Sequence, residues 1–279
     1  MKDFSQYKLN VKKSPFDPRT YKAAKFLKVY TFPAELDMRD VFDKYFPIFD
    51  QGSQGSCAAC AGTAMRQWQE YIDTTLTKKL SEQFIYNNRE ELDQEGMYMQ
   101  NLMSILFKVG VCLDELCIYG DLKKPTVSAY KDALKRLVKG YAQVESIDEF
   151  KQALYSQGPC VIAVPVYNYT ERMWYQRSGD QFLGGHAMCC VGYTKDGFII
   201  RNSWSDEWGQ NGYAIMPYND FPWIWETWTT IDADTNTSTG SPTTTLKPEP
   251  KKKLSWWQIS LLTLGVIAII TTVVLLLLR

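Results

Sequence analysis

A glycine-rich turn that leads directly into a helix at a cysteine constrains this chain most. The run QGSQGSC, from Gln51 to Cys57, precedes a stretch from Cys57 to Tyr71 that is predicted to be helical. A thiol at a helix N-terminus lies at the positive end of the macrodipole, beside N–H groups that lack intrahelical partners. This location lowers the pKa of a thiol, so the sequence predicts a nucleophile at Cys57.

Two further blocks far downstream carry polar residues that could serve such a nucleophile. The run GGHAM, from Gly184 to Met188, contains His186, the only histidine of the chain. The run RNSW, from Arg201 to Trp204, contains Asn202. A cysteine, a histidine and an asparagine in this order are the residue types of a thiol-dependent acyl-transfer site.

These blocks resemble those of the papain-like cysteine peptidase family. The resemblance covers roughly residues 37 to 230. The matching segments are Gln51–Cys57, Leu80–Gln83, Gly185–Ala187 with Val191–Tyr193, and Ile200–Trp204 continuing through Trp208–Tyr213. The resemblance implies an α+β, papain-like two-lobed fold, with a helical lobe, a β-rich lobe and the active cleft between them.

The resemblance also implies catalytic roles. Cys57 would be the nucleophile, and His186 would pair with it and then donate a proton to the leaving amine. Asn202 would hold the imidazole in the useful tautomer. The Gln51 amide and the Cys57 backbone N–H would bind the oxyanion. Trp204 would shield the hydrogen bond between His186 and Asn202 from water.

Substrate-binding residues follow from the same resemblance. Gly96 corresponds to one of the family's paired glycines that bond the substrate backbone, and Trp204 also borders the cleft. Ala163 and Ala187 fall near the pocket for the second residue before the scissile bond. Residues 205–207, Ser-Asp-Glu, replace a neutral stretch, so we expect an acidic leaving-group side.

The periodicity of the chain agrees with an α+β class because helices come first and strands follow. Ser81 and Ser146 are predicted N-caps. Helices are predicted over residues 57–71, 81–91, 97–109, 127–139 and 146–155, and strands over 160–166, 187–193, 197–202 and 213–216.

The chain divides into four predicted parts. Residues 1–36 form an extended N-terminal segment and residues 37–234 the catalytic domain. Residues 1–35 are shorter than the helical prosegment of many family members, so we expect a short form made without a conventional zymogen stage. The alternative is that the segment wraps across both lobes. Residues 235–253, rich in Thr, Ser, Pro and Lys, are predicted to be a flexible linker.

Residues 254–279 are predicted to form a C-terminal transmembrane segment. The run from Ile259 to Leu278 is apolar and uncharged, and about 20 such residues span a bilayer core. Trp256 and Trp257 have the position of interfacial aromatics. Lys251–Lys253 precede the span, which predicts a single-pass anchor with the catalytic domain on the cytosolic side, in a host membrane if the source is a virus.

The composition of the chain limits which partners, metals and disulfides it can have. The formal net charge is zero, which gives no indication of a nucleic acid partner. One histidine excludes a two-histidine zinc site, and we predict neither metal nor cofactor. Seven cysteines cannot all pair, and Gln54 stands where secreted relatives usually carry a bridging cysteine. Both features favour a reducing compartment.

The sequence therefore predicts a membrane-tethered cysteine endopeptidase acting on polypeptides. Two alternatives remain. A papain-fold acyl transferase or a hydrolase of ubiquitin-like tails would keep the fold and change the reaction. A catalytically idle, membrane-anchored scaffold would only bind peptide in its cleft, but it has no physical need for Cys57, His186, Asn202 and Gln51 together.

Overall fold

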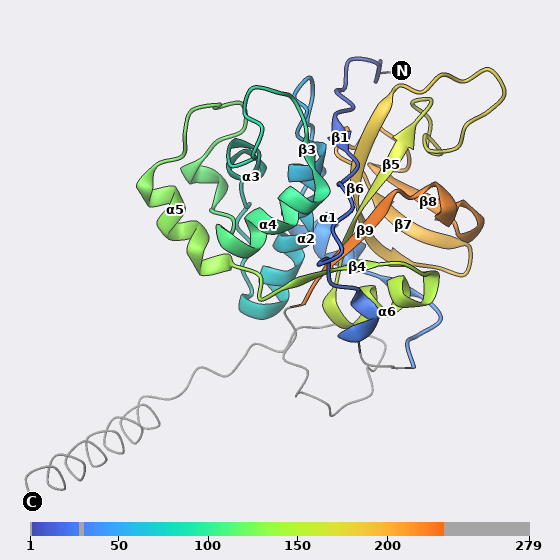
Figure 1. Ribbon diagram of the computed structural model, residues 1–279, viewed down its shortest axis with the longest axis horizontal. Helices are drawn as coiled ribbons and strands as arrows, with labels where there is room; N and C mark the ends of the chain where they lie inside the picture. The colour runs from blue at the N-terminus through green and yellow to red at the C-terminus, as the bar shows by residue number, and fades with distance from the viewer. Residues whose placement is uncertain (1, 28–30, 232–279) are drawn as a thin grey trace, which may run out of the picture. The chain divides into compact units, whose positions relative to one another are not determined.

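The computed structural model describes residues 2–27 and 31–231, and helices and strands lie in separate layers there (Figure 1). The predicted linker and transmembrane segment lie outside the described residues. The α-helices are α1 (Arg39–Tyr45), α2 (Cys57–Thr74), α3 (Glu82–Asn87), α4 (Met99–Lys108), α5 (Val127–Ala133) and α6 (Ile147–Gln157). Short 3₁₀ turns are η1 (Ala23–Lys25), η2 (Asp114–Leu116), η3 (Leu134–Arg136) and η4 (Tyr218–Trp223).

The strands form one large antiparallel sheet and one small parallel pair. The strands are β1 (Val11–Lys12), β2 (Leu36–Asp37), β3 (Met97–Tyr98), β4 (Tyr141–Val144), β5 (Cys160–Val166), β6 (Gly184–Tyr193), β7 (Gly197–Arg201), β8 (Tyr213–Pro217) and β9 (Glu226–Thr230). The large sheet has the order β4-β9-β5-β6-β7-β8, and β2 pairs with β6. The small sheet is the parallel pair of β1 and β3. The predicted α+β class is confirmed.

Helix α2 begins at Cys57 as predicted and packs its small residues against both lobes. Its first turns are buried, and Gly62 lies so close to α4 that an added Cβ would be 2.5 Å from Leu102 Cδ1. The helix ends where Thr75 adopts a left-handed conformation with φ of 60°. The small residues let α2 approach its neighbours closely, which fixes the position of Cys57.

Side-chain caps begin three helices, and two of these caps were predicted. Ser81 Oγ accepts from the Phe84 N–H, and Ser146 Oγ accepts from the Glu149 N–H. Thr126 caps α5 in the same way. Helix α3 ends earlier than the sequence predicted because Arg89 Nη1 donates to the Tyr86 carbonyl at 2.8 Å, which satisfies the helix end there.

The N-terminal segment (residues 2–12) contributes to the same hydrophobic core as the two lobes. Tyr7 and Val11 are buried in it, together with residues of α2, β5 and β6. Strand β1 lies between β3 of the helical layer and β6 of the sheet (Figure 1). The segment therefore lies across the two lobes. This is the alternative that the sequence left open for residues 1–35.

The cysteines form no disulfide. All seven are free and buried. At the position of the usual bridging cysteine, Gln54 Nε2 donates to Gln83 Oε1 at 3.1 Å. A hydrogen bond between side chains therefore connects the turn before Cys57 to α3.

No helix among the described residues is long and apolar enough to cross a membrane.

Reducing conditions should leave the fold intact. A required disulfide would contribute about 2–5 kcal/mol, and its reduction would lower the melting temperature by about 4–20 °C. Because every cysteine is free, we expect a change of less than about 2 °C on adding reductant. Thermal unfolding with and without dithiothreitol measures this, and a loss of folded protein on mild reduction would contradict the structure.

Candidate active site

Cys57 lies at the start of α2, where the helix meets strand β6. Its side chain is 0% exposed. Burial raises the pKa of the thiol, and the backbone N–H groups of Ala187, Ala58, Asn10 and Val11 lower it in part. Since Ala187 follows His186 in β6, the helix start brings the thiol beside the strand that carries the only histidine.

The hydrogen bonds of Asn202 determine the tautomer of His186. Asn202 Oδ1 accepts from the Ser203 N–H at 2.8 Å, so the amide oxygen and not the nitrogen faces His186. The same oxygen is 2.7 Å from His186 Nε2, which must therefore carry a proton and donate. Nδ1 is left as the basic nitrogen. It is buried and has no hydrogen-bond partner in the described part of the chain.

Trp204 covers this pair. Its ring centroid is 4.7 Å from that of His186, and the indole is 0% exposed. An antiparallel bridge joins Trp204 to Asp50, and the Gln51 N–H donates to the Ser203 carbonyl at 2.9 Å. The block that carries Asn202 is thus bonded directly to the turn that precedes Cys57.

Gln51 is held with its amide N–H₂ directed into the cleft. The Ser203 hydroxyl donates to Gln51 Oε1 at 2.8 Å, which leaves Nε2 as the donor that faces the cleft. Nε2 donates to the carbonyls of Lys8 and Gln54, both at 3.1 Å. Tyr119 anchors the same turn, because its hydroxyl donates to the Gln51 carbonyl at 2.6 Å.

The N-terminal segment lies between the helical layer and the sheet at this point. Lys8 supplies the carbonyl that Gln51 binds, and Asn10 forms a parallel bridge with Gly185. A Cβ added to Gly96 would be 1.8 Å from the Asn10 carbonyl oxygen, and one added to Gly185 would be 2.4 Å from that of Val11. The backbone of the segment therefore lies directly on the glycines of both walls.

Burial reverses the predicted effect on the Cys57 pKa. The helix N-terminus was expected to lower it, but burial dominates and raises the pKa of the Cys57 thiol above its ordinary value. Burial also lowers the pKa of His186 to about 4, against the opposing hydrogen bond to Asn202. Both groups are therefore uncharged at neutral pH in this closed form, because no water reaches them.

The predicted substrate-binding residues fall into two groups. Gly96, with a positive φ of 83°, and Trp204 border the N-terminal segment. Ala163 and Ala187 are a register pair of β5 and β6, and both are fully buried. They lie behind the cleft wall, and in this form they present no free surface.

Two positioning residues escaped the sequence analysis. Ser203 was quoted only as part of a motif, and its proximity to Gln51 arises from tertiary contact. Tyr119 also contacts Ser56, with 2.8 Å between the hydroxyl oxygens, and stands in a loop between α4 and α5 without a recognisable pattern. Only a model of the fold could have found either residue.

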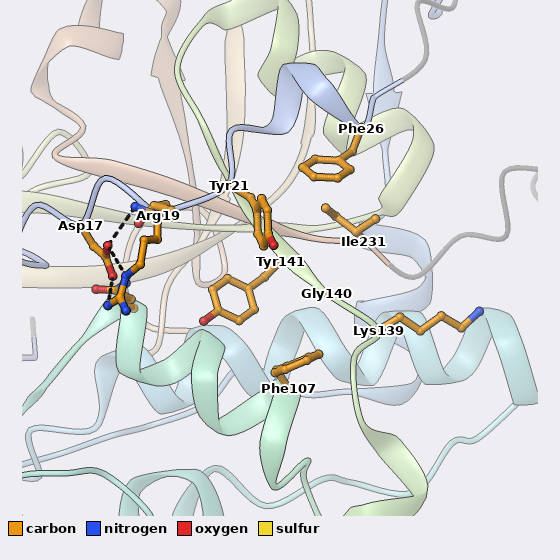
Figure 2. A pocket seen from close by; sticks show the side chains of 11 residues that line it. Asp17, Arg19, Tyr21, Phe26, Phe107, Lys139, Gly140, Tyr141 and Ile231 are labelled. Carbon is orange, nitrogen blue, oxygen red and sulfur yellow. Dashed lines mark hydrogen bonds and ion pairs between the residues drawn. The ribbon is translucent and has the colours of Figure 1, made fainter.

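Nothing in the described part of the chain brings three His, Cys, Asp or Glu side chains together as metal ligands. A cavity of about 670 Å³ does lie elsewhere (Figure 2). Tyr21, Phe26, Phe107 and Tyr141 line it, and none of the candidate catalytic residues does. It is therefore a separate feature from the cleft.

Comparison with known proteins agrees with this geometry. Residues 32–223 match the model of the papain family cysteine proteases. The uncharacterized peptidase C1-like protein L477 of Acanthamoeba polyphaga mimivirus is 29% identical over 238 residues, which cover 73% of this chain and 76% of the relative. The cathepsin B-like CP1 of Giardia intestinalis is 32% identical over 202 residues, 65% of this chain and 67% of the relative.

The same family appears among solved structures. Xylellain, a cysteine protease from Xylella fastidiosa, superposes with a TM-score of 0.70 at 26% identity, covering 84% of this chain and 99% of xylellain. The class is thus a cysteine peptidase of two-lobed α+β fold. The chain belongs to the papain family of cysteine proteases.

The buried, neutral His186 should make stability sensitive to acid. In the unfolded chain a histidine binds a proton below about pH 6.5, whereas His186 in the folded chain does so only near pH 4. The unfolded state therefore binds more protons as pH falls, and about 2 kcal/mol of unfolding free energy should be lost between pH 7 and pH 5.

Urea unfolding of the wild type and of His186→Gln at both pH values measures this loss. The variant keeps an amide for Asn202 and does not titrate, so its loss should be smaller by about 2 kcal/mol. Equal losses in the two proteins would show that His186 is not held neutral.

Proposed function

We propose that this papain-family protease is an endopeptidase whose reaction is carried out by Cys57, His186, Asn202 and Gln51. The observation that carries the proposal is the hydrogen bond between His186 Nε2 and Asn202 Oδ1. It leaves Nδ1 basic, on a strand whose next residue, Ala187, faces the Cys57 sulfur. A thiol at a helix start that faces the strand of an oriented imidazole supplies the two groups that nucleophilic catalysis requires.

The reaction would proceed in two steps. His186 Nδ1 takes the Cys57 proton, and the thiolate attacks the scissile carbonyl carbon. The resulting oxyanion accepts hydrogen bonds from Gln51 Nε2 and the Cys57 backbone N–H. The C–N bond of the tetrahedral intermediate breaks as the proton on Nδ1 passes to the leaving amine, which leaves a thioester on Cys57. Nδ1 then takes a proton from a water molecule, which attacks the thioester, and the C–S bond breaks to release the carboxylic acid and the Cys57 thiol.

Gln51 already donates a hydrogen bond to a carbonyl group in this structure. Its Nε2 binds the Lys8 carbonyl oxygen at 3.1 Å, which occupies the place that a substrate oxyanion would take. Hydrolysis therefore requires the N-terminal segment to leave the cleft. Water that then enters would solvate charge and favour the thiolate–imidazolium pair over the neutral pair of the closed form.

Substitution at each position should affect the rate according to its role. Cys57→Ala should abolish both hydrolysis of a peptide substrate and covalent labelling by an epoxide inhibitor. His186→Ala should reduce kcat/KM by about 10²–10⁴-fold, because the proton carrier is lost. Gln51→Ala should reduce it by about 10²–10³-fold, because one oxyanion donor is lost.

Cys112→Ala is the matched control. Cys112 is equally buried but belongs to a separate apolar cluster with Phe84 and Ala129. The Cys112→Ala variant should keep both labelling by the inhibitor and turnover of the peptide substrate. Full activity in His186→Ala, or an inhibitor adduct on a thiol other than Cys57, would contradict the assignment. Absence of any adduct even after the N-terminal segment has been displaced from Cys57 would favour the idle scaffold.

Membrane tethering is the second part of the proposal. Its support is the sequence alone: the apolar run 259–278, preceded by Trp256, Trp257 and Lys251–Lys253. The lysines favour the cytosolic side for the catalytic domain. Tethering would raise the effective concentration of substrates on the same membrane.

The full-length protein should stay in the pellet on alkaline carbonate extraction of expressing cells. Protease added outside sealed vesicles with their cytosolic face outward should digest the catalytic domain, while a lumenal marker stays protected. Release by carbonate would show that residues 259–278 do not span a bilayer. A protected catalytic domain would show the opposite orientation.

A further inference from the structure

The first turn of α2 carries two thiols, of which the proposed reaction uses only one. Cys57, Ala58, Ala59 and Cys60 form a C-x-x-C motif, and the sequence contains no other. Cys57 is the first residue of the helix, and Cys60 follows it in the same buried turn. A C-x-x-C pair at a helix N-terminus is an arrangement in which redox-active thiols are commonly found.

The backbone of this turn has the spacing that a disulfide needs. The Cys60 N–H donates to the Ser56 carbonyl at 2.9 Å, which is the regular hydrogen bond of an α-helix. In such a helix the rise and radius place the Cα atoms of residues three apart at about 5 Å. Disulfides join Cα atoms about 4.4–6.8 Å apart. Cys57 and Cys60 can therefore be bridged while α2 stays in place.

The Cys60 side chain already points back toward the start of the helix. Side chains of a helix lean toward its N-terminus, over the residues three and four positions earlier. Cys60 Sγ lies 4.0 Å from Oγ of Ser56, the residue directly before Cys57. A rotation about the Cα–Cβ bond of Cys60 is thus the change that turns its sulfur from Ser56 to Cys57.

The surroundings of the two thiols differ in a way that gives them different roles. Burial raises the pKa of the Cys60 thiol well above its ordinary value, and the charges of Glu82 and Cys57 raise it further. Burial also raises the pKa of Cys57, but backbone N–H groups, that of Ala187 first, oppose this effect. Cys57 is therefore the thiol that an oxidant attacks first, and Cys60 is the thiol that reacts with the oxidised Cys57.

We propose that Cys57 and Cys60 are a site of reversible oxidation, in which a hydroperoxide oxidises Cys57 and Cys60 then closes a disulfide with it. Cys60 thereby protects Cys57 from oxidation that cannot be reversed. The loss of peptidase activity that the disulfide would cause rests on the proposed function of Cys57. The disulfide itself depends only on the positions and chemistry of the two thiols.

The modification takes two steps, written here for hydrogen peroxide. The Cys57 thiolate attacks one peroxide oxygen, the O–O bond breaks, and hydroxide leaves and takes up the former thiol proton as water; Cys57 is oxidised by two electrons to a sulfenic acid. The Cys60 sulfur then attacks the Cys57 sulfur. The S–O bond breaks as the S–S bond forms, and the hydroxide leaves with the Cys60 proton as water. A dithiol reductant restores both thiols and is itself oxidised to a disulfide.

The second thiol changes what a peroxide does to the first. A sulfenic acid without a neighbouring thiol is oxidised further to a sulfinic acid, which thiol reductants do not restore. With Cys60 in the same turn, the sulfenic acid of Cys57 is instead converted to a disulfide, which a dithiol reductant opens. Disulfides of reducing compartments are usually transient and redox-sensing, in agreement with the free thiols of this structure.

Mass spectrometry of the full-length protein tests the disulfide directly. The protein is incubated with hydrogen peroxide until its oxidation state no longer changes, and remaining thiols are alkylated before tryptic digestion. Cleavage after Lys44 and Arg66 gives a peptide, 45–66, whose only cysteines are Cys57 and Cys60. We expect this peptide without alkyl groups and two hydrogen atoms lighter than the dithiol form, and we expect dithiothreitol to reverse the change. A peptide that stays reduced, or that carries only a sulfinic acid at Cys57, would overturn the proposal.

A variant without the second thiol tests its protective role. Cys60→Ala should lose peptidase activity in peroxide as the wild type does, but dithiothreitol should restore activity only in the wild type. Its peptide 45–66 should carry a sulfinic acid at Cys57, which fragmentation distinguishes from oxidation of Met65. Cys112→Ala, which removes a buried thiol of a separate cluster, should recover like the wild type. Equal recovery in Cys60→Ala and in the wild type would overturn the protective role.

The two measurements separate this inference from the proposed function. The mass of peptide 45–66 reports the disulfide whether or not the protein hydrolyses peptides. A reversible disulfide between Cys57 and Cys60 in a protein without peptidase activity would refute the proposed function alone. Hydrolysis that depends on Cys57, in a protein whose peptide 45–66 never forms the disulfide, would refute this inference alone.

Discussion

The packing of the first turn of α2 against β6 is the contact on which the rest of the site depends. The sulfur of Cys57 meets the Ala187 N–H there, beside His186. The neighbouring turn is bonded to the strand end through Gln51 and Ser203, both by the backbone and by the side chains. Because three segments distant in sequence share these bonds, a small shift of α2 would separate the proposed nucleophile, base and oxyanion donor together.

The same burial decides the charge state of the site. Removing water raises the pKa of Cys57 and lowers that of His186, so the closed form holds an uncharged thiol and imidazole. Charging both in an apolar setting would cost several kcal/mol per ion before their attraction is counted. In the proposed reaction the covering segment would oppose catalysis in two ways: the Lys8 carbonyl takes the hydrogen bond that Gln51 would give to the oxyanion, and the segment keeps water away from the thiol and the imidazole.

The sequence predicted the features that depend on local pattern. The start of α2 at Cys57, the caps at Ser81 and Ser146 and the long buried strand at 160–166 agree with the structure. Strands β1 and β3 were missed because two residues show no periodicity, and their pairing joins Val11 to Met97. The expected low pKa of Cys57 failed for a related reason, since the segment that buries it comes from a remote part of the chain.

Glycines line the centre of the proposed cleft, and larger side chains line one end of it. Gly96 and Gly185 contact the passing backbone so closely that any side chain there would collide with it. Walls made of glycine contact only the peptide groups of an extended backbone, so they do not distinguish its side chains. Side chains line the end of the site beyond Trp204, and among them are the carboxylates of Asp50 and Glu207. Lys2 of the chain itself lies between these carboxylates, with its Nζ 3.1 Å from Asp50 Oδ2 and 3.1 Å from Glu207 Oε2, so a charged side chain occupies this end while glycines contact the backbone.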